Sequence, residues 1–361
     1  MEIVPADDDG VMQRVVVYGA YGHTGRFVTA ELVRRGLVPV LSGRDAGKLA
    51  ALGAQYPDLE QRTAAIDDAD ALRAALDGAA AVINTAGPFL DTAGPVAAAA
   101  VRAGVHYLDV SAEQAAAAAL RDLDGDARAA GVAVVPAMAF YGGLADLLAT
   151  AALDGATTAD EITVAIALDR WWPTEGTRIT GRRNTAPRLV VTDGRLVPLE
   201  DPAPTGTWTF PEPFGRQDVV GLPFSEIITI AAHLQVTTVR SVFAGAALRE
   251  LRDPNTPAPE AVDDTGRSAQ RFVVDVLVRT GDDERRITAS GQDIYAVTAP
   301  ILVEALTRIL DGRAGATGVL APGALLDAVD VLHALAPAHL TVAESGGAMA
   351  GNRAPRVGSP A

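Results

Sequence analysis

The feature that most constrains this chain is a glycine-rich turn between a short apolar strand and a helix. Gly19, Gly22 and Gly25 follow the apolar residues 15–17, and a helical pattern starts at once. Gly19 permits a tight turn, Gly22 lets a diphosphate reach the backbone, and Gly25 lets the helix pack on the strand. The helix N-terminus adds free N–H groups and a partial positive charge. The segment predicts a dinucleotide site that includes Tyr21, His23 and Thr24, and a turn serving packing alone is the alternative.

The end of the second predicted strand indicates which dinucleotide binds. An NAD site usually carries Asp or Glu there, about twenty residues after the glycines, to hold the ribose 2′-hydroxyl. This chain has Ser42, Gly43 and Arg44 instead. A guanidinium at this position can bind a 2′-phosphate through two hydrogen bonds. The sequence therefore favours NADP as the cofactor, and a solvated loop arginine is the alternative.

The ends of the next two predicted strands complete the cofactor site. Asp67 closes the third strand, where we expect it to contact the adenine amino group. The segment 84–89, Asn-Thr-Ala-Gly-Pro-Phe, closes the fourth strand, and its tight turn leaves room beside the nicotinamide ribose. We expect this turn to bind the cofactor through Asn84, Ala86, Gly87 and Pro88. An ordinary strand-to-helix turn is the alternative.

Strand-like and helix-like segments alternate over residues 11–136, which is typical of a parallel sheet with helices on both faces. A long Ala-rich helix is expected over 112–130. After this region the chain has longer strands, one of them at 227–231, separated by turns that favour hairpins. The predicted fold is α/β. It is a Rossmann-type doubly wound parallel sheet with an inserted α+β domain, built on a mostly antiparallel sheet, over 137–290.

The last part of the chain is predicted to be helical and then irregular. Residues 291–340 are expected to form helices that return to the dinucleotide-binding domain, with one helix over 295–310 and helical spacing again over 324–335. The segment 345–361 is rich in Gly, Ala and Pro without periodicity, and we expect it to be a disordered tail.

Composition excludes several classes of function. Acidic residues outnumber basic ones 45 to 30, and a net charge of −15 disfavours binding to nucleic acids and anionic membranes. The chain has no Cys, which excludes disulfides and thiolate chemistry, and Lys48 is its single lysine. Five His without close pairing predict no metal site. The acidic first ten residues and the lack of a long apolar run predict a cytoplasmic protein without membrane insertion.

Four motifs together carry a resemblance to a known family. They are GAYGHTGR at 19–26, SGRD at 42–45, NTAGPFLDTAGPVAAAAVRAGVHYLDVSAEQ at 84–114 and DIYAVTAP at 293–300. With these motifs the chain resembles the saccharopine dehydrogenase-like NADP-binding oxidoreductases, which include saccharopine reductases and trans-acting enoyl reductases. The resemblance implies NADP binding by the glycine turn and Arg44, a nicotinamide cleft lined by Phe89, Tyr107, Asp109 and Glu113, and a homodimer. The family pattern Thr-Gly-Glu is replaced here by Ser-Ala-Glu at 111–113.

Hydride transfer needs a neighbouring group that handles a proton or polarises the acceptor. Tyr141 is the first candidate because Gly142 and Gly143 leave room for a ligand beside it. Tyr295 opens the helix that returns to the same cleft, and Asp109 is the third catalytic candidate. A packed aromatic at the domain junction is the alternative for Tyr141.

Substrate recognition is expected around residues 169–185. Trp171 and Trp172 offer flat apolar surface there, and Arg178 and Asn184 offer polar contacts, with Phe89 and Glu113 completing the set. A solvent-facing basic hairpin is the alternative. The sequence as a whole predicts an NADP-dependent oxidoreductase that acts on a small organic substrate, first of all at a C=N (imine) bond. A trans-acting enoyl (C=C) reductase and a non-catalytic NADP-binding sensor or scaffold are the alternatives.

Overall fold

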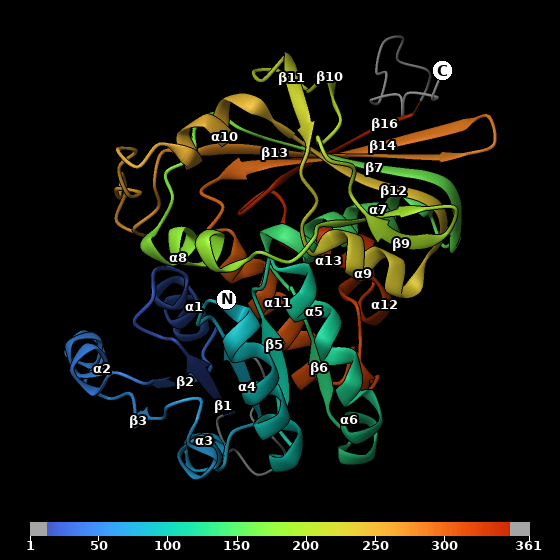
Figure 1. Cartoon of the computed structure of the whole chain (residues 1–361). Coiled ribbons are helices and arrows are strands. Elements are labelled where there is room, and N and C mark those ends of the chain that lie inside the picture. Colours follow the sequence, from blue (N-terminus) through green and yellow to red (C-terminus); the bar gives the residue numbers. More distant parts are fainter. Residues whose placement is uncertain (1–12, 347–361) are drawn as a thin grey trace.

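The computed structural model of the protein describes residues 13–346, which form two β-sheets with helices around and between them. Figure 1 shows the parallel sheet in the lower half of the molecule and the second sheet across the top. No helix within residues 13–346 is long and apolar enough to cross a membrane.

The first sheet is parallel and has seven strands in the order β15-β6-β5-β4-β1-β2-β3. The strands are β1 (Arg14–Tyr18), β2 (Val38–Gly43), β3 (Gln61–Thr63), β4 (Ala81–Asn84), β5 (His106–Asp109), β6 (Ala133–Val135) and β15 (Gly318–Val319). The strand order reverses between β1 and β4. A crevice opens at the carboxyl ends of the strands at such a reversal, and ligands bind there in open α/β sheets.

Alternate residues of each strand face opposite sides of the parallel sheet, and both sides are covered by helices. Val15 and Val17 belong to one apolar cluster with residues of α1 (His23–Arg34) and α2 (Ala46–Gly53). Val16 belongs to a second cluster with residues of α3 (Ala69–Leu76), α4 (Phe89–Ala103) and α6 (Asp124–Ala130). This two-sided burial confirms the predicted doubly wound sheet.

The second sheet has nine strands and is mostly antiparallel, with β7 and β12 as its parallel pair. Its strands are β7 (Thr158–Leu168), β8 (Leu189–Thr192), β9 (Arg195–Pro198), β10 (Thr205–Thr209), β11 (Arg216–Gly221), β12 (Gln235–Ala244), β13 (Arg271–Thr280), β14 (Asp283–Gln292) and β16 (Thr341–Gly346). The mostly antiparallel sheet was predicted. The domain limits 11–136, 137–290 and 291–340 stay predictions.

Helices of the second half lie between and beside the two sheets (Figure 1). They are α7 (Ala145–Leu153), α8 (Glu175–Arg183), α9 (Glu226–His233), α10 (Gly245–Arg252), α11 (Thr298–Leu310), α12 (Pro322–Leu325) and α13 (Ala328–Leu335). A short π-helix (Phe140–Leu144) joins the end of β6 to α7. Helix α11 is buried along nearly its whole length and packs beside α1 of the parallel sheet.

The strand predicted at 227–231 is wrong, because these residues lie in helix α9. An apolar run of five residues fits a buried helix as well as a buried strand. Here Ile227, Ile228 and Ile230 are all buried, and Ser225 and Glu226 at the start of the run are fully buried as well. Burial of the helix on several sides removes the periodicity that would have revealed it.

The single helix predicted over 112–130 is also wrong. Two α-helices, α5 (Gln114–Ala119) and α6, flank a turn of 3-10 helix at Leu120–Leu123. The Asp124 carboxylate accepts hydrogen bonds from Val319 and Arg128, so contacts with β15 fix the break. Alanine favours helix but gives no sign of where a break falls.

Two C-terminal expectations need correction. The helix expected from Tyr295 begins at Thr298, because Asp293 accepts hydrogen bonds from the N–H groups of Tyr295 and Ala296. The helical spacing over 324–335 is divided between the end of α12 and α13. Asp327 caps the N-terminus of α13 by accepting the N–H of Asp330. In the expected tail 345–361, residues 345–346 end strand β16, and 347–361 lie outside the described residues.

Candidate functional site

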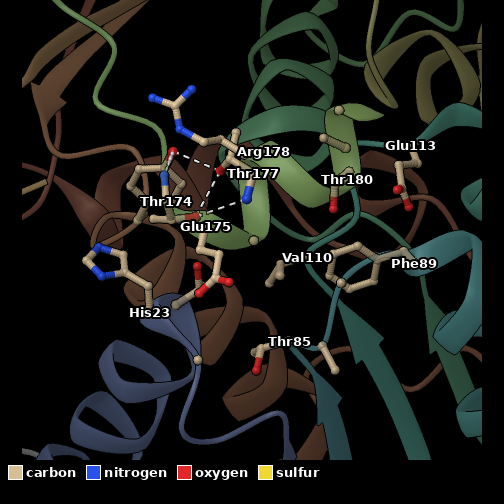
Figure 2. A pocket seen from close by; sticks show the side chains of 18 of the residues that line it. His23, Thr85, Phe89, Val110, Glu113, Thr174, Glu175, Thr177, Arg178 and Thr180 are labelled. Carbon is tan, nitrogen blue, oxygen red and sulfur yellow. Dashed lines mark hydrogen bonds between the residues drawn. The ribbon is translucent and has the colours of Figure 1, made fainter. Parts of the chain in front are cut away.

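A cavity of about 1240 Å³ lies between the carboxyl ends of the parallel strands and the second sheet. Residues that follow β1, β2, β4 and β5 line its floor, and helix α8 lies over it. Figure 2 shows Thr174, Thr177 and Thr180 of this helix region above the cavity, with His23 on one side and Glu113 on the other. The volume exceeds the ~300–1,000 Å³ of a typical ligand pocket. A dinucleotide and a small substrate therefore fit together.

The glycine turn has the geometry of a diphosphate cradle. Gly19 has φ +87°, and a Cβ there would lie 2.9 Å from the Ala86 nitrogen. A Cβ on Gly25 would lie 2.4 Å from the Gly19 oxygen, so the helix can approach the strand only with glycine at this place. No side chain caps α1 at Gly22, which leaves the first N–H groups of the helix to a ligand. Gly19, Gly22, His23 and Thr24 line the cavity, and Gly25 lies beneath.

The end of β2 brings two basic side chains to one edge of the cavity. Arg44 is exposed at the cavity wall, and within residues 13–346 it forms no salt bridge. Lys48, one helical turn further along, places its Nζ 5.8 Å from the centre of the Tyr21 ring and also lines the cavity. Sequence reasoning did not assign Lys48 to the site, although its spacing of four from Arg44 was visible.

Three predicted cofactor residues support the site from below or stand beside it. The Ser42 hydroxyl donates to the Arg62 carbonyl, while the Ser42 carbonyl accepts the N–H of Gly19 at 2.8 Å. Asn84 is fully buried, and its amide donates to Thr92 and Tyr107 and accepts from the Ala86 N–H at 3.0 Å. Ser42 and Asn84 thus hold the turns that face the cavity, but neither residue lines the cavity itself. Asp67 is exposed and lies off the cavity wall.

The turn after β4 presents Thr85, Ala86 and Gly87 to the cavity, and the Gly87–Pro88 peptide is cis. Helix α8 lies directly over this turn, since a Cβ on Gly87 would be 3.0 Å from the Thr180 hydroxyl. Pro88 itself is not part of the wall.

Asp109 is buried, and the structure argues against its predicted catalytic role. One carboxylate oxygen accepts the N–H groups of Ser111 and Ala137 at 2.9 and 2.8 Å, and the other accepts the Tyr107 hydroxyl at 2.9 Å. Both oxygens are thus occupied, and the side chain does not reach the cavity. Burial raises the pKa of Asp109, and the hydrogen bonds from Ala137 and Ser111 oppose that rise. Asp109 joins the ends of β5 and β6.

Glu113 is the ionisable group best placed for proton transfer. It is 1% exposed and lines the cavity. Its Oε2 accepts the N–H of Leu90 at 3.0 Å at the start of α4, and its Oε1 has no partner in the structure. Burial raises its pKa to about 7, against the hydrogen bonds from Leu90 and Phe89. At neutral pH such a carboxyl is present both with and without its proton.

Tyr141 reaches the cavity because the backbone kinks after it. Gly142 has φ +90°, and a Cβ there would lie 2.7 Å from Ala137 and 2.8 Å from the Ser225 hydroxyl. The Tyr141 ring lies 4.3 Å from Phe224, and its buried hydroxyl has no hydrogen-bond partner. Burial raises the pKa of Tyr141 well above its ordinary value, so the hydroxyl keeps its proton. An unpartnered buried donor on a cavity wall is what a ligand group would satisfy.

Tyr295 holds the start of α8 rather than facing the cavity freely. Its hydroxyl lies 2.9 Å from the Thr177 hydroxyl and accepts the Trp171 indole N–H and the Thr174 N–H at 3.4 Å. With this many partners it is a positioning residue in this structure. His23 packs edge-on against the Tyr295 ring at 5.2 Å. The His23 Nε2 has no partner, and burial lowers its pKa, so the ring is neutral at pH 7.

The predicted substrate segment lies over the cavity, partly as helix α8 instead of the alternative hairpin. Trp171 is buried, lines the cavity and stacks on Phe243, whereas Trp172 lies off the wall under Arg170. The Arg178 guanidinium donates to the carbonyls of Asp253 and Thr256, the latter at 2.7 Å. Phe89 and Asn184 line the cavity as expected.

Arg188 is a cavity residue that sequence reasoning missed. Its Nη1 donates to the Pro223 carbonyl, and its guanidinium lies 5.0 Å from the centre of the Phe224 ring. Nothing local marked it, because an arginine in a loop before a short strand is usually solvated. Within residues 13–346 no three His, Asp or Glu side chains gather as metal ligands.

Taken together, a parallel sheet with its reversal at β1 and β4, an open helix N-terminus and two cations beyond β2 define a dinucleotide-binding protein of the doubly wound α/β class. Residues 15–135 match the family described as saccharopine dehydrogenase NADP binding domain. Over these residues the chain is similar to an NADP-binding domain family, which the motifs had indicated.

Solved structures of similar fold extend the likeness beyond that domain. Apo saccharopine dehydrogenase (L-Glu forming) from Saccharomyces cerevisiae is 13% identical, with a TM-score of 0.66 over 92% of this chain and 100% of that chain. At 13% identity, this structural similarity shows that the two proteins share a fold and nothing about a shared activity. GenD2 from gentamicin A biosynthesis, in complex with NAD, is 15% identical, with a TM-score of 0.44 over 93% of this chain and 97% of that chain, too low to support a conclusion. No curated protein sequence matches this chain.

Proposed function

We propose that this protein is an NADP-dependent oxidoreductase that transfers hydride between NADPH and a small organic substrate, with a C=N bond as the reacting bond. The supporting observation is one continuous cavity that contains the glycine turn, the pair Arg44 and Lys48, and the ionisable carboxyl of Glu113. When bound, the cofactor supplies the hydride.

The preference for NADP rests on the edge of the cavity beyond β2. Arg44 and Lys48 are exposed basic side chains one helical turn apart, and both line the cavity. An acid at the end of β2, which would hold a free 2′-hydroxyl, is missing, since Asp45 caps α2 by accepting the Lys48 N–H. The charge of this edge suits a 2′-phosphate.

Glu113 is proposed as the proton donor in the direction of reduction. As hydride adds to the imine carbon, the protonated Glu113 carboxyl gives its proton to the imine nitrogen, which leaves an amine and a carboxylate. Two features favour this role: the unpartnered Oε1 and the pKa of about 7. Tyr141 offers a second hydroxyl in the same cavity, whose high pKa makes it a hydrogen-bond donor rather than an acid.

The test is stopped-flow NADPH oxidation with cyclic imines, enoyl thioesters and ketones, in wild type and in Glu113→Gln. Imine-dependent oxidation that the variant loses, with unchanged NADPH affinity, is the expected result. Turnover of enoyl thioesters alone would instead identify a trans-acting enoyl reductase. NADPH binding without consumption by any compound would identify a sensor or scaffold.

Two further expectations stay proposals. A homodimer, implied by the resemblance, has structural room at β10, whose outer edge pairs with no strand among residues 13–346. Light scattering after gel filtration measures the oligomeric state. The cytoplasmic location stays a prediction.

A further inference from the structure

Arg188 carries a charge that no described residue neutralises by a salt bridge. The residue is half-buried on the cavity wall, with Nη1 donating to the Pro223 carbonyl at 2.5 Å. Its other N–H groups have no hydrogen-bond partner within residues 13–346. Burial lowers the pKa of Arg188, an effect that the charges of Glu226 and Tyr141 oppose. A guanidinium stays protonated even so, and a half-buried cation with free donors suits an anion.

Glu226 is the acid whose charge acts on Arg188, yet the two form no salt bridge, and its Oε2 has no partner among residues 13–346. Its Oε1 accepts the N–H of Phe224 at 2.9 Å and the hydroxyl of Ser241 at 2.5 Å. The side chain is fully buried, and burial raises its pKa, which favours the neutral form. Glu226 thus forms no salt bridge with Arg188, and the remaining N–H groups of the guanidinium are available to a ligand.

Tyr141 adds a hydrogen-bond donor beside this cation. Its hydroxyl is buried without a partner. The Tyr141 ring and the Arg188 guanidinium both contact the Phe224 ring, at 4.3 Å and 5.0 Å from its centre. Aromatic rings surround them: Phe224 lies 4.3 Å and Trp171 6.1 Å from the Tyr141 ring, and Phe140 lies 4.9 Å away. The subsite thus combines one cation and one hydroxyl with an apolar wall.

The position of this subsite relative to Glu113 is set by its neighbour Gln114. The Gln114 amide accepts the N–H of Leu189 at 2.7 Å and donates to the carbonyls of Leu189 and Phe224, each at 2.9 Å. Glu113 directly precedes Gln114, and Arg188 directly precedes Leu189. Both Glu113 and Arg188 line the cavity. The bonds between Gln114 and Leu189 thus hold the chain segments of Glu113 and Arg188 side by side at the cavity wall.

We infer that Arg188 and Tyr141 bind one carboxylate of a substrate whose body is apolar and whose reacting carbon lies toward Glu113. The inference rests on the proposed oxidoreductase function and names its substrate class. One half-buried guanidinium matches a single negative charge, and a second charge among the aromatic rings would be buried without a partner. The other arginines of the cavity do not compete. The Arg178 guanidinium is bound to carbonyl groups, and Arg26, Arg182 and Arg252 are exposed. Arg44 is also exposed and lies at the edge assigned to the cofactor.

The experiment is calorimetric titration of the NADPH-bound protein with phenylacetate, with its neutral isostere phenylacetamide, with glutarate and with phenylphosphonate. Phenylacetate is expected to bind at least about tenfold more tightly than phenylacetamide, because hydrogen bonds to charged groups are the stronger ones. Glutarate lacks the apolar body and phenylphosphonate carries a second charge, so both should bind more weakly than phenylacetate. Arg188→Gln should abolish the preference for the carboxylate, and Tyr141→Phe should reduce it.

Arg195→Gln is the matched control, because Arg195 is exposed on β9 and does not line the cavity. It should bind all four probes as wild type does. Equal affinity for phenylacetate and phenylacetamide, or an unchanged preference in both Arg188→Gln and Tyr141→Phe, would overturn the inference. So would tighter binding of phenylphosphonate or glutarate. The same titration without NADPH separates the two proposals. If the protein bound phenylacetate but not NADPH, the proposed NADP-dependent function would be refuted and the carboxylate subsite would not.

Discussion

Buried polar atoms without partners are concentrated at the cavity. Folded proteins satisfy nearly all such atoms, so exceptions point to missing ligands or waters. The His23 Nε2, the Glu113 Oε1 and the Tyr141 hydroxyl are three of them, and all three residues line the cavity. His23 begins α1 after the glycine turn, Glu113 directly precedes α5, and Tyr141 lies in the π-helix before α7, so the three are far apart in the sequence. Their convergence is the strongest residue-scale sign that this cavity is a reaction site.

Arg44→Asp is expected to reverse the cofactor preference. The aspartate would repel a 2′-phosphate and accept a hydrogen bond from a 2′-hydroxyl, so the ratio of kcat/KM for NADPH to that for NADH should fall below one. Loss of a charged hydrogen bond is worth about 1.5–3 kcal/mol, roughly ten- to a hundredfold. Lys48→Ala should lower the ratio less. An unchanged ratio in Arg44→Asp would contradict the assignment of this edge.

Glu113→Gln is expected to lower kcat by about 10²–10⁴-fold, the usual contribution of a general acid, with little change in the Kd of NADPH. Wild-type reduction should weaken as pH rises through about 7, because the proton to be donated is lost. Glu200→Gln, at an exposed position outside the cavity, is the control. A variant that retains kcat and the wild-type pH profile would exclude Glu113 as the donor.

The same substitution should change stability with pH in a defined direction. The pKa of Glu113 is raised from 4.5 to about 7 in the folded protein, so the folded state binds more protons than the unfolded state between these values. Stability contributed by this group is therefore present at low pH and lost as pH rises through that window. Urea denaturation should show Glu113→Gln more stable than wild type at pH 8, by up to about 3 kcal/mol. At pH 5 the difference should nearly vanish.

At the scale of elements, helix α8 is the most weakly packed part of the site. None of its residues is buried, although it covers the cavity. It is held mainly by side-chain contacts: Tyr295 binds Thr177, Arg178 donates to carbonyls of the loop after α10, and Arg183 pairs with Asp91 of α4 at 2.9 Å. Figure 2 shows Glu175 extending from this helix into the cavity. An element with exposed surface and few buried contacts opens at low free-energy cost, so we expect substrate to enter by displacement of α8.

Arg178→Ala is expected to raise KM more than it lowers kcat. The guanidinium ties α8 to the loop after α10 through the carbonyls of Asp253 and Thr256, so its loss loosens the cover of the cavity without touching the reacting atoms. Hydrogen exchange over residues 174–184 should become faster in the variant. A fall in kcat with constant KM would contradict this role. A higher KM with unchanged exchange would show instead that Arg178 contacts the substrate directly.

At the scale of the whole molecule, an ion-pair network joins the first helix to the helices that follow the second sheet. Arg35, just after α1, contacts Glu31 at 2.8 Å and Glu304 of α11 at 2.6 Å, and Arg308 pairs with Glu304 at 2.9 Å. Both glutamates are less than one tenth exposed, at 8% and 7%. Burial alone would raise the pKa of each carboxyl, but the neighbouring arginines outweigh it and lower both pKa values.

Arg35→Gln is expected to destabilise the protein by about 1–3 kcal/mol, between the values for exposed and buried ion pairs. Because the folded pKa values of Glu31 and Glu304 lie below 4.5, their stabilisation is present above that pH and is lost as pH falls through the folded values. Urea denaturation between pH 7 and pH 3 should show a steeper loss in wild type than in Arg35→Gln. Parallel curves would mean that the ion pairs between α1 and α11 do not contribute to stability.

The elements whose signals are local were predicted well, and those decided by packing were not. The glycine turn at Gly19 and the alternation of strands and helices over the first third are set by adjacent residues, so they can be seen in the sequence. The helix at 226–233 and the break at Leu120 depend on neighbours more than 80 residues away, such as Ser111 for Ser225 and Val319 for Asp124. Apolar and Ala-rich runs do not show which partners will bury them.

The sequence by itself determined the nucleotide half of this protein. Backbone freedom at the glycines, the helix N-terminus and the basic residue after β2 are properties of one short segment each. The tertiary structure alone decided which polar groups face the cavity. It enclosed Asp109 in hydrogen bonds, tied Tyr295 to α8, and left Glu113, Tyr141 and Arg188 with unused polar atoms. The reason is physical: an ionisable group acts through its surroundings, and those surroundings come from segments that only folding brings together.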